Sequence, residues 1–372
     1  MAPNPQRRRS GAILTVDLDA IRVNYRLLRA RAAPAACSAV LKSDAYGLGA
    51  LAVAAALYQE GCRHFFVAHL DEGIALRPGV PADAAIFVLH GPPPDTEADF
   101  TAHQLTPVLN SAQQVAGWRA HAKAQGRALG AVLQVCSGMS RMGLEPAEVD
   151  AWLADPHYLD GIEMLYLMSH LACAEQSEHP MNAMQLERFK AIRARLPQCR
   201  ASFANSSAIF LPKDYHFDLV RPGAALYGIA PVAGAANPMQ PVVRLQGKIL
   251  QTRTIAAGEH VGYSRRYTAS EARHVATVSV GYADGWLRSM STLGLAVVDG
   301  VRVPQIGAIS MDSITLDVSG IAPERLAPGS LVDLICAEHT VDAVAKLANT
   351  IGYEVLTNLG ARYYREYTGG GA

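Results

Sequence analysis

The sequence has few cysteines, and they are not arranged for a disulfide framework or a metal site. Six cysteines are scattered over 372 residues, with no CxxC pair among them. In a chain of this length, such a distribution is typical of reduced thiols. We therefore expect free cysteines and no metal centre.

Excess charge of one sign and long apolar runs are also missing. Lysine plus arginine and aspartate plus glutamate each number 33, so the net charge is zero, which argues against a nucleic-acid or anionic-membrane partner. No run approaches the roughly 18 apolar residues of a membrane span, and "GAILTV" (11–16) is too short for the core of a signal peptide. We expect a cytoplasmic protein whose residues 1–12 form a flexible, solvated tail.

What the sequence does contain is enough apolar residues for a large core, at 50% of the chain. The length allows two or three domains. From about residue 36 to 228, short apolar runs alternate with amphipathic ones, which indicates parallel strands covered by helices. The strand candidates are 37–41, 64–69, 85–90, 105–109, 131–136, 161–168, 201–204 and 217–220, and helix candidates between them include 111–125, 146–153 and 182–195.

Eight strands in this alternation favour an α/β fold with a closed (β/α)8 barrel. A doubly wound open sheet is the alternative, but no GxGxxG sequence follows the first strand to support it. From about residue 236 the pattern becomes β-rich, with a hairpin predicted at the Asp299–Gly300 pair and one helix over 340–352. The sequence thus predicts a barrel over 13–235 and a mostly-β domain over 236–372.

A lysine stands at the end of the first barrel strand, in "AVLKSDAYGLGA" (39–50). Barrel active sites are built at the carboxyl ends of strands. Two interpretations fit Lys42 at this position. It is either a lysine whose stem packs at the strand end while its charge reaches water, or an amine nucleophile that forms a Schiff base with an aldehyde such as pyridoxal phosphate.

A pyridoxal phosphate site also needs a place for the phosphate, and barrels often provide one after strands 7 and 8. Those loops here are "NSSAIF" (205–210) and "RPGAALYG" (221–228). Ser206 is positioned to cap a helix whose N–H groups would face an anion, and Gly223 would let the backbone approach closely. An ordinary serine cap and a Pro-Gly turn explain the same residues without a ligand.

Arg221 directly follows the eighth apolar run and is expected at the same end of the barrel as Lys42. Arginine stays protonated and has no acceptor, so it would keep a pyridine nitrogen beside it unprotonated. A surface charge is the alternative role. His170, after the sixth strand, is either a support for Arg221 or a hydrogen-bonded core histidine.

These motifs together resemble one family. "AVLKSDAYGLGA" resembles the cofactor-lysine motif of alanine racemases, A-V-x-K-x-x-A-Y-G-x-G, and further motifs follow in the family's order over nearly the whole chain. They are "LTVDLDAIRVNYRLLRA" (14–30), "SGMSRMGL" (137–144), "MSHLACAE" (168–175), "NSSA" (205–208), "VRPGAALYG" (220–228), "AGEHVGYSRRYTA" (257–269), "VGYADGW" (280–286) and "GAISMDS" (307–313).

The resemblance implies a pyridoxal 5'-phosphate enzyme that racemises alanine, works as a homodimer with shared sites and supplies D-alanine for peptidoglycan. It implies two catalytic acid/base residues, Lys42 and Tyr263, the tyrosine coming from the other subunit. The implied cofactor-binding residues are Lys42, Tyr46, His170, Asn205, Ser206, Arg221, Gly223 and Ala224. The implied substrate-binding residues are Arg141, Met311 and Tyr282, the last narrowing the entrance.

Three positions depart from the family's usual residues. Gln134 stands where many members have a lysine that becomes carbamylated, Cys136 where aspartate is frequent, and Leu48 where histidine is common. No catalytic group is lost. These departures leave open alanine, serine or broader specificity, and two other hypotheses also stay open: a barrel-type amino-acid decarboxylase and a non-catalytic protein that binds the cofactor.

Overall fold

The computed structural model describes residues 4–196 and 198–370 and divides the chain into two compact units. The barrel unit contains Ile21–Leu226 and Ala230–Met239. The β unit contains the described residues up to Ala20, Tyr227–Ile229 and those from Gln240 onward. This division differs from the predicted boundaries, because the first strand of the chain belongs to the sheet of the β unit rather than to the barrel.

The described residues of the barrel unit form nine short parallel strands, which belong to one sheet. In chain order they are β2 (Ala36–Cys37), β3 (Ala39–Val40), β4 (His64–Val67), β5 (Ala85–Val88), β6 (Leu105–Leu109), β7 (Leu129–Gln134), β8 (Ile162–Met168), β9 (Ala201–Asn205) and β10 (Leu219–Arg221). The order across the sheet is β2-β10-β9-β8-β7-β6-β5-β4-β3. Since β2 and β3 are two halves of one extended segment, that segment pairs on both sides and the sheet closes.

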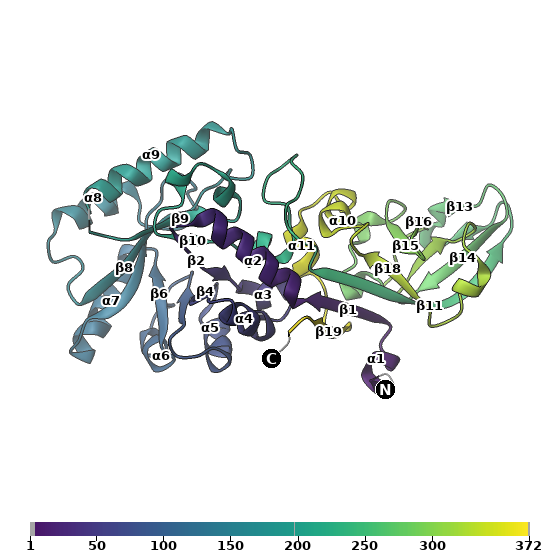
Figure 1. Ribbon diagram of the computed structural model, residues 1–372, viewed down its shortest axis with the longest axis horizontal. Coiled ribbons are helices and arrows are strands. Elements are labelled where there is room, and N and C mark those ends of the chain that lie inside the picture. Colours follow the sequence, from purple (N-terminus) through teal and green to yellow (C-terminus); the bar gives the residue numbers. More distant parts are fainter. Residues whose placement is uncertain (1–3, 197, 371–372) are drawn as a thin grey trace. The chain divides into compact units, whose positions relative to one another are not determined.

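Helices cover the outside of these strands (Figure 1). They are α2 (Leu18–Ala32), α4 (Ala50–Gln59), α5 (Leu70–Leu76), α6 (Glu97–Ala102), α7 (Ala112–Gln125), α8 (Pro146–Ala154) and α9 (Pro180–Ala194). The segment α3 (Lys42–Gly47) is a left-handed turn directly after β3. Short 3-10 turns lie at Arg77–Gly79, Ser207–Phe210, Lys213–Tyr215 and Ala224–Tyr227. The predicted (β/α)8 barrel is confirmed. The ends of its eight strands lie within two residues of the predicted ends.

The barrel core is apolar and aromatic, as alternating buried strands require. The rings of Phe66 and Phe87, on neighbouring strands, stack with their centroids 4.6 Å apart. Phe65, Phe66, Phe87 and Phe203 are all fully buried or nearly so. Packing of this kind fixes the strands and leaves their carboxyl ends free to carry polar residues.

The β unit is built mainly on antiparallel strands. Its strands are β1 (Ala12–Asp17), β11 (Val243–Ile255), β12 (His260–Val261), β13 (Tyr267–Thr268), β14 (Arg273–Val278), β15 (Leu295–Val298), β16 (Val301–Ile306), β17 (Ile314–Asp317), β18 (Leu331–Ile335) and β19 (Tyr364–Thr368), with β19 parallel to β1. Strands β11, β14, β17, β16, β15 and β18 pair in a closed ring. The helices are α1 (Pro5–Arg9), α10 (Val341–Ala348) and α11 (Gly352–Thr357), and 3-10 turns lie at Tyr263–Arg265, Tyr282–Asp284, Arg288–Met290 and Pro323–Arg325.

Two local predictions for the β unit can be compared with its structure. The hairpin at Asp299–Gly300 is confirmed: both residues have positive φ, and Val298 pairs with Val301, which is the geometry of a two-residue primed turn. A single helix was expected near the end of the chain, but α11 follows α10 after a left-handed Asn349. The short α11 escaped prediction because one turn and a half carries little periodicity.

The N-terminal segment is more ordered than the predicted flexible tail over 1–12, of which residues 1–3 lie outside the described residues. Residues 5–9 form α1, which Asn4 caps with its side chain. Arg7 pairs with Glu366 at 3.0 Å, and Lys248 donates to the carbonyls of Arg7 and Arg8. Strand β1 then lies between β11 and β19 (Figure 1). These long-range partners, which a local pattern does not reveal, hold the segment.

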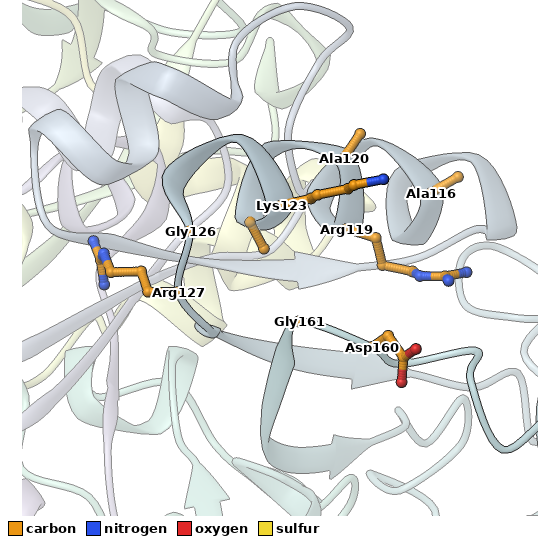
Figure 2. A pocket seen from close by; sticks show the side chains of 9 residues that line it. Ala116, Arg119, Ala120, Lys123, Gly126, Arg127, Asp160 and Gly161 are labelled. Carbon is orange, nitrogen blue, oxygen red and sulfur yellow. The ribbon is translucent and has the colours of Figure 1, made fainter.

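An open hollow on the barrel unit lies at the amino-terminal ends of β7 and β8 (Figure 2). Arg119, Lys123 and Arg127 line it together with Asp160. This is the end of the barrel opposite to the one where active sites are built. Within the described part of the chain, no helix is long and apolar enough to span a bilayer.

Candidate active site

The residues predicted from the barrel half of the sequence lie at the carboxyl ends of its strands. Lys42 follows β3, Arg141 follows β7 and His170 follows β8, while Asn205 is the last residue of β9 and Arg221 the last of β10. Because parallel strands of a closed barrel end on one side, these side chains belong to one mouth. The structure thus brings together residues that are distant in sequence.

An unusual turn follows Lys42. Ser43, Asp44, Ala45 and Tyr46 all have left-handed helical angles, with φ between 53° and 57°. Left-handed backbone costs roughly 1–2 kcal/mol for each residue other than glycine, and such strain is concentrated at functional sites. Compensating hydrogen bonds are present, since Asp44 Oδ1 accepts from the N–H of Ala50 at 2.7 Å.

Tyr46, Ser206 and Gly223 form a cluster beside this turn. A Cβ atom at Gly223 would lie 2.4 Å from the hydroxyl of Tyr46, so only glycine allows this approach. Ser206 Oγ accepts from the N–H of Gly223 at 2.8 Å and from that of Ala225 at 3.3 Å. Two hydroxyls therefore meet beside a buried glycine at the strand ends, and hydroxyl groups can donate to a phosphate.

The prediction that Ser206 caps a helix is wrong. Ser206 itself has helical backbone angles and its side chain makes no cap hydrogen bond. The neighbouring Asn205 accepts from the N–H of Ala208 at 3.0 Å instead, because its side chain is the one placed before the 3-10 turn. Ser206 is thereby free to hold the backbone at Gly223.

Arg221 is a buried cation with neutral partners. Its side chain is almost fully enclosed; Nη1 donates to Ser202 Oγ at 2.5 Å and Nη2 donates to the carbonyl of Ser169 at 2.8 Å. Among the described residues no carboxylate forms an ion pair with it. Burial lowers the pKa of Arg221 to about 9, which still leaves the guanidinium charged at neutral pH.

His170 lies against Arg221, with 3.3 Å between Nη2 and the imidazole Nδ1. Burial, followed by the charges of Arg221, Arg141 and Lys42, lowers the pKa of His170 to about 3. The ring is therefore neutral at physiological pH. Because arginine only donates, Nδ1 accepts and the single ring proton is on Nε2.

Lys42 is half-buried, and its environment favours the neutral amine. Burial lowers the pKa of Lys42, the charge of Arg141 lowers it further, and the carboxylate of Glu72 opposes both. A lysine becomes a nucleophile and a base when its pKa falls in this way. The alternative of a lysine that merely reaches into solvent is not favoured by this burial.

The other three predicted site residues, Tyr263, Tyr282 and Met311, belong to the β unit and are exposed there, by 72%, 42% and 52%. Tyr263 follows β12 in a short turn with left-handed Ser264. Tyr282 and Met311 lie on adjoining loops, because the N–H of Tyr282 donates to Ser310 and that of Ala283 to Met311, both at 3.0 Å. The structure therefore places Tyr282 and Met311 together.

One arginine holds these two loops. Arg362 donates to both carboxylate oxygens of Asp284 at 2.6 and 2.9 Å and to Asp312 at 2.7 Å. Asp284 is buried and also accepts from the N–H of Gly281 at 2.8 Å. A bidentate pair of this kind fixes geometry as well as charge, so Arg362 ties the loop of Tyr282 to the loop of Met311.

Comparison with known proteins gives a direct assignment. Residues 16–231 match the model of the alanine racemase N-terminal domain, and residues 242–367 match that of the C-terminal domain. The chain belongs to the alanine racemase family. Among its relatives, "Alanine racemase, catabolic" of Mesorhizobium japonicum is 52% identical over 97% of this chain and 94% of the relative. The alanine racemase of Rhodospirillum rubrum is 50% identical over 97% of each chain.

Solved structures of the alanine racemase family share the fold. The enzyme of Bartonella henselae, solved with covalently bound pyridoxal phosphate, superposes with a TM-score of 0.93 and 41% identity, covering 96% of this chain and 99% of that one. The biosynthetic alanine racemase of Pseudomonas aeruginosa gives a TM-score of 0.89 at 35% identity, with 97% and 100% covered. Both likenesses extend over the barrel and the β unit.

The positions that depart from the alanine racemase pattern have defined places in the barrel unit. Gln134 is buried at the end of β7, and its backbone carbonyl accepts from Leu144 at 2.8 Å. Cys136 Sγ accepts from the N–H of Ser140 at 3.3 Å. Leu48 is fully buried. The backbone of Gln134 thus joins the two ends of the loop that carries Arg141, and Cys136 contacts the residue before Arg141.

Three residues near Lys42 were missed by the sequence analysis. Glu72 accepts hydrogen bonds around the lysine's turn, and His69 and His90 contact each other with their Nδ1 atoms 3.3 Å apart. Burial, the charge of His69 and that of Lys42 lower the pKa of His90. A signal for the histidines was present, because each follows an apolar run closely, as Lys42 does.

The role of Arg362 can be tested by hydrogen exchange on the full chain. We expect Arg362→Met to speed amide exchange in peptides covering 281–286 and 310–313, since the clamp between Asp284 and Asp312 is lost. Arg288→Met removes an exposed arginine of the same unit and is the control. Mass spectrometry of digested samples measures both, and equal exchange in the two variants would contradict the assignment.

Proposed function

We propose that the protein interconverts L-alanine and D-alanine with pyridoxal 5'-phosphate as its cofactor. The observation that carries the proposal is the convergence of Lys42, the cluster of Tyr46, Ser206 and Gly223, and buried Arg221 at one barrel mouth. Membership of the alanine racemase family and the covalently bound pyridoxal phosphate of the Bartonella henselae relative support it.

The residues of the mouth fit the parts of this cofactor. Tyr46, Ser206 and the backbone at Gly223 and Ala224 would hold the phosphate, with Asn205 supporting the loop. Arg221, which has no acceptor, would face the ring nitrogen and keep it unprotonated. Lys42 would hold the aldehyde carbon through its amine. When bound, the cofactor supplies delocalisation of negative charge from the substrate Cα.

Racemisation requires a proton to leave one face of Cα and return on the other, so two acid/base groups must flank it. Lys42 serves one face and Tyr263, from the partner subunit, serves the other. A tyrosine has a reference pKa of about 10, so its anion needs a donor. Arg221 would stabilise this anion through His170, whose Nδ1 accepts from Arg221 and whose Nε2–H would be the donor.

Arg141 would bind the substrate carboxylate, and Met311 and Tyr282 would shape the substrate region and its entrance. The carboxylate is the natural partner of a guanidinium, which can donate two parallel bonds. Neutral Gln134 cannot supply the negative charge that a carbamylated lysine has. Carboxylate binding therefore depends on Arg141 without an anionic support from that position.

The fold does not determine which amino acids the protein racemises, so the substrate range has to be measured by kinetics. We propose that the protein acts in the cytoplasm and that alanine is its main substrate. The D-alanine that it makes would be used for peptidoglycan. One relative is named catabolic and one neighbour biosynthetic. Rates with L-alanine, L-serine and L-lysine decide between alanine, serine and broader racemases, and release of carbon dioxide would identify a decarboxylase.

The cofactor assignment predicts a yellow protein that borohydride labels on one lysine. Reduction should fix the cofactor covalently, and peptide mapping should find it on Lys42. Lys42→Ala should lose essentially all racemisation, because the amine is both the attachment point and one proton carrier. Lys123→Ala, at the opposite end of the barrel, is the control. Label on another lysine would refute the assignment, and a cofactor-binding protein without racemase activity would refute the proposed reaction.

The two-face assignment predicts different effects on the two enantiomers. In Tyr263→Phe, we expect exchange of the Cα hydrogen with D₂O to persist for D-alanine, from which Lys42 takes the proton, and to vanish for L-alanine. Proton NMR of each enantiomer measures this exchange. Tyr267→Phe, in the same motif, should leave both rates near wild type. Equal loss for both enantiomers of Tyr263→Phe would count against the assignment.

A shared site predicts recovery of activity from two inactive proteins. If Lys42→Ala and Tyr263→Ala chains are unfolded and refolded together, about half of the dimers are mixed and each mixed dimer has one intact site. Activity should return to roughly a quarter of wild type. Either variant refolded alone is the control. No recovery, with mixed dimers verified by mass spectrometry, would mean that Tyr263 serves its own chain.

A further inference from the structure

The turn after Lys42 needs support from outside itself. Four consecutive residues, none of them glycine, have the left-handed conformation, and Gly47 continues it with φ of 83°. Asp44 supports the far end of this turn through the N–H of Ala50. The near end, at Ser43, is the part joined directly to Lys42.

Glu72 is the side chain that holds the near end. It lies in the first turn of α5, and its Oε1 accepts from the N–H of Ser43 at 2.6 Å. Its Oε2 accepts from the N–H groups of Ala68 and His69 at 2.7 and 3.0 Å. One carboxylate thereby ties the lysine's turn to the residues that follow β4.

The same carboxylate acts on the charge of the lysine. Around Lys42 the charged groups are Arg141, which favours the neutral amine, and Glu72, which favours the ammonium. Burial adds to the effect of Arg141. His90, which follows β5, is also influenced by His69, Lys42, Glu72 and Arg141. Glu72 is therefore both the anchor of the turn and the negative charge that opposes Arg141.

We propose that Glu72 is the positioning residue for Lys42 and holds the left-handed turn that follows this lysine in place. The role of Lys42 in this proposal rests on the proposed function. The hydrogen bonds of Glu72 do not depend on it. Glu72 acts through the backbone of Ser43 and through its charge. Loss of the carboxylate should therefore loosen the turn and make Lys42 less basic.

The test uses the full chain with its cofactor bound and compares Glu72→Gln with Asp71→Asn. Both substitutions remove one negative charge from the first turn of α5, and Asp71 is exposed. In Glu72→Gln, amide exchange in the peptide covering 43–48 should be at least about tenfold faster, because an amide oxygen is a weaker acceptor than a carboxylate. In Asp71→Asn it should match wild type.

A pH profile separates positioning from loss of structure. With D-alanine, whose proton Lys42 takes, the acid limb of kcat should move to lower pH by about one unit in Glu72→Gln, because an opposing carboxylate no longer stabilises the ammonium. With L-alanine the acid limb should stay in place. Glu72→Asp retains the negative charge but has a shorter side chain. Its acid limb of kcat with D-alanine should match wild type, whereas amide exchange at 43–48 should remain fast.

The outcomes distinguish the two proposals. If exchange at 43–48 in Glu72→Gln and Glu72→Asp equals that of Asp71→Asn, the positioning role of Glu72 is overturned. A pH limb that moves equally for both enantiomers, or not at all, overturns the effect on Lys42. Failure of the proposed reaction would instead appear in the unsubstituted protein, as absence of racemisation, and would leave the exchange result standing.

Discussion

Hydrogen bonding along both edges of residues 36–40 is the interaction on which the barrel mouth depends. β2 pairs with β10 and β3 with β4, and the N–H groups of Ser38 and Val40 donate to Val220 and Pro222 at 3.0 and 2.9 Å. Because this segment is the first barrel strand and pairs with both the second strand and the last, the carboxyl ends form a ring rather than a row. Lys42 therefore shares a site with residues from the other end of the barrel sequence.

The mouth is cationic although the chain as a whole is neutral. Lys42, Arg141 and Arg221 lie there with the single opposing carboxylate of Glu72 among the groups that act on the lysine. Burial, followed by the charges of Arg221, Arg141 and Lys42, lowers the pKa of His170 and keeps the ring neutral. A cationic mouth favours ligands that carry phosphate and carboxylate groups. The positive charge of such a site attracts anions. Individual hydrogen bonds determine where each proton lies.

Much of this arrangement was predictable because the end of an apolar run is a local signal. Lys42 and Arg221 could be placed at one mouth from the strand pattern and the rule that parallel strands end together. The left-handed turn could not be predicted, because residues such as Ala45 give no local signal for positive φ. Glu72 was missed for a related reason, since its three acceptor bonds go to backbone groups of any residue type. The role of Tyr263 came from the family resemblance and not from the fold.

The place of β1 has a consequence for the order in which the chain is made. β1 is among the first residues to leave the ribosome, yet its two partners are β11 and β19, the latter near the end of the chain. The barrel unit is complete by Met239, so its residues are all available while β1 still lacks both neighbours. One edge of β1 stays unpaired until β11 is made and the other until β19 is made, and an unpaired strand edge invites association with other chains. Late synthesis is therefore the stage at which this protein most needs protection from aggregation.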